Sequence, residues 1–366
     1  MHCRHFLSTD MLKAVIDLLA QNKFNVFHWH IVDSESFPYA SKSVPELAKG
    51  AFSPKHQYSI QDIKDIVEFG RLHGIRILPE IDTPGHVASW GRGVPKLLAR
   101  CFDDNGTETF DRNIFDVTQD AVLWDVLDAL FKEVFELFPE KFVHLGADEA
   151  AFWTRECWEN NPNISTFMQR YNINTTDELQ QWYLTKLLSL LRNQKEGKKK
   201  KYIIWQELFD YGRAPEDVIV QVWKGSTPHT QMESIKNVTG AGHFALLSSC
   251  WYLDVQRGSV DWSQHYNCDP TSFVGSVVQK KLVLGGEAAL WGEWVDESNL
   301  IPRLFPRASA VAERLWSFIE EPIEINKVWP RLYEMQCRMA ARGFPAEPGN
   351  GPGFCENEYK AKLPWL

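Results

Sequence analysis

The chain has 366 residues, of which 44% are hydrophobic, and a formal net charge of −9. This composition supplies a large core, and the acidic balance provides no basic surface that would hold nucleic acid. No stretch of about 18 consecutive apolar residues occurs, so we expect no membrane span. The first ten residues, MHCRHFLSTD, lack the pattern of a signal peptide.

Strand-like runs alternate with amphipathic helical segments along the chain. The first run covers residues 4–7, and the others are FNVFHWHIVD, IRILPEID, KFVHLGADE, YIIWQEL, VIVQVWK, HFALLSSCWYLD and LVLGGEAALWGE. Helix starts are expected at Thr9 and Asp10, at a capping box formed by Ser59 and Asp62, and at Thr118. The link between the fifth and sixth runs is too short for a full helix.

Eight alternating units predict a (β/α)8 TIM barrel, an α/β fold, rather than a doubly wound sheet. We assign residues 1–320 to the barrel. Residues 321–366 are expected to form a C-terminal helix and tail packed on it.

The predicted strands end in polar and aromatic residues, and the active sites of TIM barrels lie at the carboxyl ends of the strands. These residues are Trp29, His30, Asp33, Glu80, Asp82, His86, Asp148, Glu149, Trp205, Glu207, Trp223, Trp251, Tyr252, Asp254, Glu287, Trp291 and Glu293, with Arg4 beside the first run. Any one of them alone could serve packing or helix capping. Together, flat apolar tryptophans and hydrogen-bonding carboxylates suit a pyranose ring, which has apolar faces and a hydroxyl rim.

Two details separate this site from common hydrolase patterns. Asp148 and Glu149 are adjacent, so in an extended chain they point apart, unlike the facing carboxylates of an ordinary glycosidase. His28 and His30 share a strand face and could bind zinc. The fifth and sixth runs supply no further histidine, so we expect no metal and no cofactor.

Four Asn-x-Ser/Thr sequons indicate a secretory route; they begin at Asn105, Asn163, Asn174 and Asn237 and lie in loop-like polar stretches. The seven cysteines fit either disulfides in an oxidising compartment or free thiols in the cytosol. Their spacing alone does not decide between these alternatives.

Nine motifs resemble glycoside hydrolase family 20, the β-N-acetylhexosaminidases, over nearly the whole chain. They are CRHFLS, FHWHIVDSESFPY, PEIDTPGH, HLGADE, IIWQELF, VQVWK, WYLD, GGEAALWGEWVD and LFPRASAVAERLW, and animal lysosomal enzymes look most similar. The resemblance implies an exo-acting, retaining hydrolase of terminal non-reducing β-linked GlcNAc or GalNAc. Its substrates would be the glycans of oligosaccharides, glycoproteins or glycolipids. The substrate's own acetamido carbonyl would attack the anomeric carbon and form an oxazolinium intermediate, without a protein nucleophile.

The resemblance also implies a role for each site residue. Glu149 would be the general acid and then the base, with a raised pKa. Asp148 would hold the acetamido N–H, and His86 and Asp33 would support the acid. The remaining substrate-binding residues would be Trp205, Trp223 and Trp291 around the acetamido methyl, Tyr252 on the carbonyl oxygen, and Arg4, Asp254 and Glu293 on the sugar hydroxyls.

Further expectations follow from the same resemblance. It implies Cys101–Cys157 and Cys337–Cys355 disulfides, leaving Cys3, Cys250 and Cys268 unassigned, a lysosomal or secreted location, and a possible homodimer. The family usually carries a preceding α/β domain and, in these relatives, a signal sequence. This chain begins almost at the first barrel run, so it looks N-terminally truncated.

Val255 follows Asp254 where relatives that take sulfated sugars tend to have arginine, which predicts a preference for neutral substrates. Two rival hypotheses remain. One is a catalytically silent sugar-binding protein, and the other is a metal-dependent barrel hydrolase.

Overall fold

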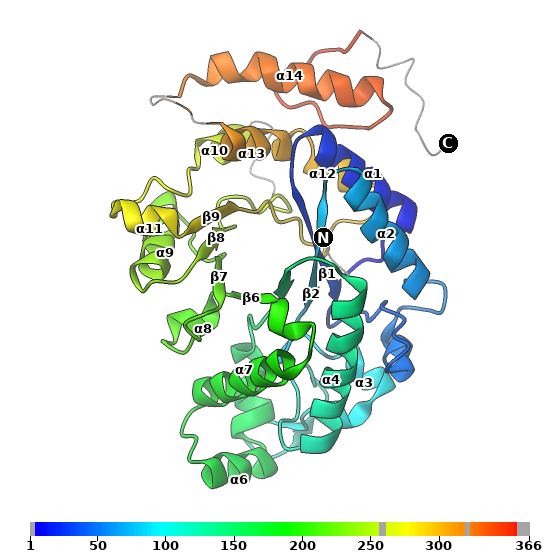
Figure 1. The fold of residues 1–366 in the computed structure, drawn as a ribbon, viewed down its shortest axis with the longest axis vertical. Coiled ribbons are helices and arrows are strands. Elements are labelled where there is room, and N and C mark those ends of the chain that lie inside the picture. Colours follow the sequence, from blue (N-terminus) through cyan, green and yellow to red (C-terminus); the bar gives the residue numbers. More distant parts are fainter. Residues whose placement is uncertain (1–3, 256–260, 318, 320–322, 357–366) are drawn as a thin grey trace.

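A computed structural model describes residues 4–255, 261–317, 319 and 323–356. Its main sheet is parallel and curled, with helices around it (Figure 1), which confirms the predicted α/β barrel class. The strand order is β1 (Val26–Val32), β2 (Arg76–Ile81), β5 (Phe142–His144), β6 (Lys201–Trp205), β7 (Ile219–Val222), β8 (Ala245–Leu247) and β9 (Val283–Gly286). A separate antiparallel pair joins β3 (Cys101–Phe102) to β4 (Glu108–Thr109).

The strands of the main sheet are apolar because both of their faces are covered. Six of the seven residues of β1 are buried, and its parallel partner β2 is buried from its second residue onward. Such near-continuous apolar runs explain why the sequence located these strands without an alternating pattern.

The helices form the outer layer of the barrel. The longer ones are α1 (Thr9–Gln21), α2 (Ile60–Leu72), α4 (Asp120–Leu137), α6 (Pro162–Tyr171), α7 (Thr176–Asn193), α9 (Pro228–Gly240), α13 (Arg307–Trp316) and α14 (Ile325–Ala341). Shorter ones are α3 (Trp90–Gly93), α5 (Ala151–Thr154), α8 (Glu207–Asp210), α10 (Trp262–Asn267), α11 (Val277–Lys281) and α12 (Leu300–Leu304). Short 3₁₀ helices occur at η1 (Pro45–Gly50), η2 (Pro95–Leu97) and η4 (Gly197–Lys199), and η3 (Arg155–Glu159) is a short π-helix.

Local capping chemistry accounts for several helix starts. The predicted capping box of Ser59 and Asp62 is present at α2. The first helix is capped by Ser8 instead, whose hydroxyl accepts the N–H of Met11. Helix α4 starts at Asp120 rather than at the predicted Thr118, because the hydroxyl of Thr118 donates a hydrogen bond to Asp116.

The predicted strand over residues 4–7 is wrong. These residues are irregular, and within the described part of the chain no strand pairs with the outer edge of β1 or of β9. Hydrogen bonds nevertheless hold this segment beside the residues after β9, from Arg4 to Glu293, from His5 to the carbonyl of Gly292, and from Ser8 to Glu297. Hydrogen bonds that involve side chains thus replace the backbone pairing of the strand that we had predicted over residues 4–7.

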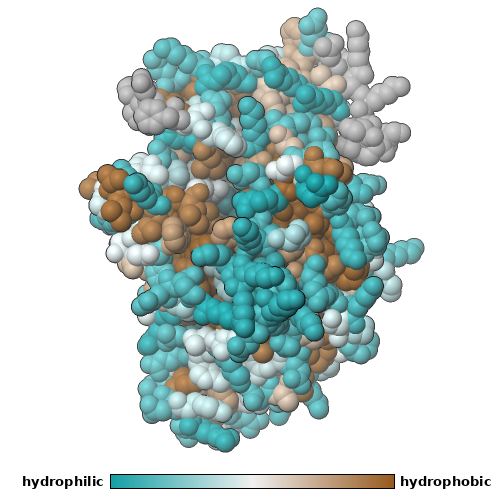
Figure 2. Space-filling model, viewed as in Figure 1, coloured by the Kyte–Doolittle hydropathy of each residue, from teal (hydrophilic) through white to brown (hydrophobic). Residues whose placement is uncertain are grey.

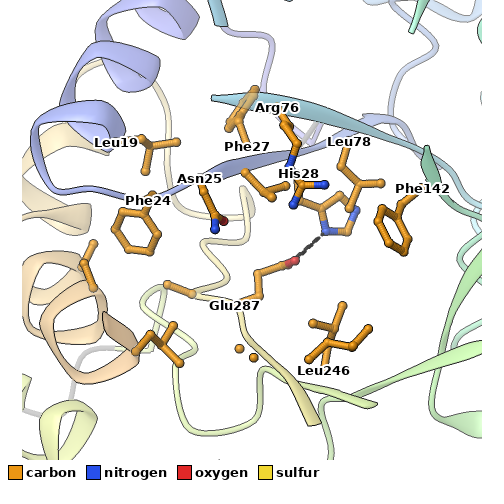
Figure 3. A pocket seen from close by; sticks show the side chains of 18 of the residues that line it. Leu19, Phe24, Asn25, Phe27, His28, Arg76, Leu78, Phe142, Leu246 and Glu287 are labelled. Atoms are coloured by element: carbon orange, nitrogen blue, oxygen red, sulfur yellow. Dashed lines mark hydrogen bonds and ion pairs between the residues drawn. The ribbon is translucent and has the colours of Figure 1, made fainter. Parts of the chain in front are cut away.

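A cavity of about 530 Å³ lies beside these two edges, at the end of the barrel where the strands begin (Figure 3). Leu19, Phe24 and Phe142 supply apolar walls, while His28 and Glu287 face each other across it. Figure 2 shows apolar side chains gathered over α11 and β9, where Val277, Val278 and Leu284 are exposed.

Helix α14 lies outside the barrel, against α10 and α13 (Figure 1). Val328 and Leu332 of α14 are buried against Trp262, Tyr266 and Ala310. The predicted division at residues 320 and 321 lies outside the described residues, as does the tail beyond residue 356. No helix of the described chain combines the length and apolar character needed to cross a membrane.

Three disulfides link cysteines of the described chain. Cys101–Cys157 and Cys337–Cys355 confirm the two predicted pairings. A third bond joins Cys250 to Cys268, which the sequence had left unassigned. Cys3 lies outside the described residues.

We predict that Cys101→Ser lowers the free energy of unfolding by about 4 kcal/mol, because the lost bond closes a long loop and restricts the unfolded chain. The sequence separation is 56 residues, against 18 for Cys337–Cys355, for which the same reasoning gives about 3 kcal/mol. Denaturant unfolding of Cys101→Ser and Cys337→Ser measures which variant loses more unfolding free energy. A larger loss from Cys337→Ser would contradict the prediction.

Candidate active site

The carboxyl ends of the strands bring the predicted site residues to one end of the barrel. Asp33 follows β1, Asp82 follows β2, and Asp148 and Glu149 follow β5. Trp205 ends β6 and Trp223 follows β7, while Tyr252 and Trp291 follow β8 and β9 and belong to segments joined by the bridge between Tyr252 and Ala289.

The loop that carries the acid pair has an unusual backbone. Gly146, Ala147 and Glu149 have φ values of 68°, 75° and 52°, in the left-handed region that side chains disfavour. The carboxylate of Asp82 accepts the N–H of Ala147 at 3.0 Å. A Cβ at position 146 would lie 1.7 Å from that same carboxylate, so only glycine fits there.

This backbone separates the two acids and sends them to different surroundings. Asp148 is buried, whereas the side chain of Glu149 is 31% exposed. His86 Nε2 lies near both, 3.4 Å from Glu149 Oε2 and 3.7 Å from Asp148 Oδ2. One imidazole therefore contacts two carboxylates that point to different places.

Asp33 contacts His86 on the side of the ring away from the acid pair. Its Oδ1 lies 3.3 Å from His86 Nδ1, and its Oδ2 accepts the Nε–H of Arg4 at 3.2 Å. Ser34 also contacts His86, at 3.5 Å, and exchanges hydrogen bonds with Asn113. The ring of His86 is thus held from the side opposite the acid pair.

The pKa of Glu149 differs from the raised value that we predicted. Its contact with His86 lowers the pKa of Glu149, and partial burial opposes this only in part. Burial instead raises the pKa of Asp148, against the opposing charge of His86. The expectation was wrong because it followed from the need for a protonated general acid and did not consider the imidazole beside it.

His86 itself favours the charged form. Burial opposes the charge, but Asp148, Asp33 and Glu149 outweigh this and hold the pKa of His86 well above its usual value. The surrounding carboxylates therefore favour the imidazolium form of His86.

The predicted aromatic residues form a continuous wall. The Trp205 and Trp291 rings lie 5.9 Å apart, and the Tyr252 ring lies 6.3 Å from Trp291 and 6.4 Å from Trp223, on which it stacks. Burial holds the pKa of Tyr252 well above its usual value, so its hydroxyl stays protonated and can donate. These four residues come from four different strand ends.

Three polar residues lie at the rim beside this wall. Arg4 pairs with Glu293, and its guanidinium lies 5.1 Å from the centre of the Trp291 ring. Asp254 Oδ1 accepts the backbone N–H of Trp291 at 3.3 Å, and burial raises its pKa. The structure therefore brings all of the predicted site residues into one connected group.

Glu80 and Glu207 hold two of the tryptophans, a role that we did not predict. Glu80 accepts the indole N–H of Trp205 at 2.9 Å, and Glu207 accepts that of Trp223 at 3.0 Å. Burial and the charge of Asp148 raise the pKa of Glu207 to about 7. Their position at strand ends was visible in the sequence, but their partners come from other strands.

Histidines and carboxylates that could bind a metal also occur beneath the site. Among the described residues, His28, Glu80 and His144 form one such group, in which Glu80 lies 2.9 Å from His28 and 3.1 Å from His144. A metal ion could enter this group only by displacing these contacts and the one from Trp205.

The large cavity of Figure 3 is not this site. It opens where the strands begin, whereas the acid pair and the aromatic wall lie where they end. This cavity would therefore direct attention to the other end of the barrel, and the convergence of polar side chains identifies the site.

The profile of the glycosyl hydrolase family 20 catalytic domain matches residues 2–318. The chain belongs to glycoside hydrolase family 20. Beta-hexosaminidase A of Caenorhabditis elegans is 44% identical over 369 residues, covering 97% of this chain and 66% of that protein. Beta-hexosaminidase subunit beta of Homo sapiens is 42% identical over 359 residues, covering 97% and 62%. This confirms the resemblance found in the motifs.

Solved structures agree on the fold. A chitobiase from Flavobacterium johnsoniae matches with a TM-score of 0.79 and 30% identity, over 92% of this chain and 50% of that one. An exo beta-N-acetylglucosaminidase from Vibrio harveyi, solved with N-acetylglucosamine, has a TM-score of 0.78 at 24% identity. This chain spans 62–66% of the length of the two hexosaminidases above.

The charged state of His86 predicts a pH-dependent stability. Because its folded pKa is raised, its contribution is complete below the unfolded value of about 6.5 and declines as pH rises through the folded pKa. His86→Asn removes the titrating group at similar size. The difference in unfolding free energy between wild type and variant should therefore be largest in acid and shrink above neutrality.

Denaturant unfolding at several pH values measures this difference. A constant gap between the two proteins across the whole range would show that folding does not raise the pKa of His86.

Proposed function

We propose that this protein is an exo-acting, retaining β-N-acetylhexosaminidase. It would release terminal non-reducing β-linked GlcNAc or GalNAc by substrate-assisted catalysis through an oxazolinium intermediate. The observation that carries this proposal is the divided acid pair, with Glu149 at the surface of the site and Asp148 buried beside the aromatic wall.

The two acids suit two parts of one sugar. Glu149 is the exposed member, so it can reach the leaving oxygen, protonate it, and later take a proton from water. Asp148 can accept the acetamido N–H and stabilise the positive charge that develops as the carbonyl attacks the anomeric carbon. No facing carboxylate is then needed as a nucleophile.

His86 and Asp33 would control the proton on Glu149. The contact with His86 lowers the pKa of Glu149. A sugar that excludes water from the acid shifts its pKa upward, because dehydration disfavours the carboxylate. Hydrolysis should therefore favour acidic pH, where the carboxyl group carries its proton.

The aromatic and polar residues would select the end of a glycan. Trp205, Trp223 and Trp291 would enclose the acetamido methyl, and the Tyr252 hydroxyl would donate to the attacking carbonyl oxygen. Hydroxyl recognition would come from Arg4, Asp254 and Glu293, whose position at the rim favours a terminal sugar.

The compartment and partners are proposed on the same basis. Three disulfides suit a lysosomal or secreted protein. The sequon asparagines Asn105, Asn163, Asn174 and Asn237 are exposed and accessible to glycosylation, although Asn163 and Asn237 lie in helices rather than in the loops we expected. The proposed partners are glycans, with no nucleic acid, and a homodimer remains a candidate assembly. We propose residue 320 as the end of the barrel domain.

We predict that Glu149→Gln lowers kcat on a chromogenic β-GlcNAc substrate by about 100-fold or more, because the amide cannot protonate the leaving oxygen. Gln at this position keeps the size of the side chain. Equal rates for the variant and the wild type would contradict the proposal.

Asp148→Asn separates the proposed mechanism from its rivals. The variant should also turn over slowly and should bind a thiazoline inhibitor, which resembles the intermediate, more weakly than wild type does. Glycan binding by the wild type without turnover would instead favour a sugar-binding protein, and loss of activity with a chelator would favour a metal-dependent hydrolase.

The neutral-substrate preference is tested at Val255, whose side chain is exposed beside Asp254. Val255→Arg adds a positive charge near the rim, so the ratio of kcat/KM for a 6-sulfated over a neutral GlcNAc substrate should rise about tenfold. Val255→Gln controls for size without charge. An unchanged ratio in the arginine variant would contradict the preference.

A further inference from the structure

An unbroken series of carboxylates and imidazoles runs through the barrel from the cavity to the acid pair. We call it the imidazole–carboxylate chain, and it consists of Glu287, His28, Glu80, His30, Asp33, His86 and Glu149. The six successive contacts measure 3.0, 2.9, 2.7, 3.1, 3.3 and 3.4 Å. Figure 3 shows its first contact, between Glu287 and His28 across the cavity.

Glu80 lies at the centre of this chain and is fully buried. Its Oε2 lies 2.9 Å from His28 and 2.7 Å from His30, both on β1. Its Oε1 lies 3.1 Å from His144 of β5 and accepts the indole N–H of Trp205 of β6 at 2.9 Å. One carboxylate therefore joins four strands and supports the aromatic wall as well as the acid.

A buried carboxylate persists as an anion only if its partners repay the lost hydration. Burial opposes the charge on Glu80, but His30, His144 and His28 hold its pKa well below the usual range. Burial likewise opposes the charge on His30, and Glu80 and Asp33 outweigh it and raise the pKa of His30. Each member of this pair thus shifts the pKa of the other toward its charged form.

We propose that Glu80 is a positioning residue for the reaction proposed above. It orients His30 and Trp205, and through His30, Asp33 and His86 it sets the pH at which Glu149 exchanges its proton. The inference rests on the proposed function, because it concerns the acid of that reaction.

Several other ionisable groups surround Glu80 and His86, and their charges also affect the pKa values of these two residues. Those facing Glu80 are His28 and His30 on β1, His144 on β5, and Asp82 and Asp148 near the strand ends; those facing His86 are Asp33, Asp82, Asp148 and Glu149. Removing one negative charge from such a set lowers the pKa of every neighbouring acid and imidazole.

The first test is independent of activity. In protein with isotope-labelled histidines, NMR titration should show that Glu80→Gln lowers the pH at which His30 loses its proton. Glu140→Gln is the matched control, because Glu140 is also buried but pairs with Arg76 outside the chain. Unchanged titration of His30 in Glu80→Gln would overturn the inference.

The second test is the pH profile of kcat/KM on the chromogenic substrate. Glu80→Gln should shift the alkaline limb to lower pH by about half a unit, because it removes the negative charge that acts on Glu149 through His30, Asp33 and His86. His30→Gln should shift the limb to higher pH, because it removes a positive charge. Glu80→Asp, which keeps the charge, should return the limb toward that of wild type.

The opposite signs separate this role from a structural one, since mere loosening of the barrel would move both variants in the same direction. Shifts of equal sign, or no shift in either variant, would overturn the inference. If Glu80→Gln does not fold, His30→Gln alone decides by the sign of its shift. If wild-type protein lacks activity, the proposed function fails, and the NMR titration still decides whether Glu80 controls His30.

Discussion

The interior of this barrel depends on ionised groups that neutralise one another away from water. Glu80, Asp33 and His86 are all buried, and each would be costly if its partners were removed. The surrounding strands are largely apolar, so these charged groups depend on one another to replace the hydration that they lose on burial. The carboxyl ends of β1, β2 and β5 must therefore lie close together to keep these charges in contact.

The same arrangement explains how a single fold can hold two adjacent acids in different states. Asp148 is surrounded by protein, and burial raises its pKa, whereas the contact of Glu149 with His86 lowers its pKa. The difference arises from the surroundings and not from the kind of acid, because both are carboxylates next to each other in the chain. A change at any one of these groups is felt by the others.

Much of the fold could be predicted because β1 and β2 are apolar on both faces and α2 has a local capping box. The strand ends also indicated the site, since Asp33, Trp205 and Trp291 follow apolar runs. Residues 4–7 have the composition of a strand, but side-chain bonds to Glu293 and the backbone of Gly292 hold them instead. Such contacts join residues almost 290 positions apart, and no local pattern reports them. The direction of the Glu149 pKa was missed for a related reason, since it depends on His86. The Cys250–Cys268 bond was missed because the spacing of seven cysteines does not decide their pairing.

The backbone of the loop that carries the acid pair has a wider consequence. Its left-handed residues and the close approach of Gly146 to Asp82 mean that the directions of the two acids are encoded in main-chain shape. An Asp-Glu dipeptide introduced into another barrel would therefore supply the same two acids without pointing them in the same directions. A designer who wanted this site would have to transplant the turn and its anchoring carboxylate first, and only then choose the acids.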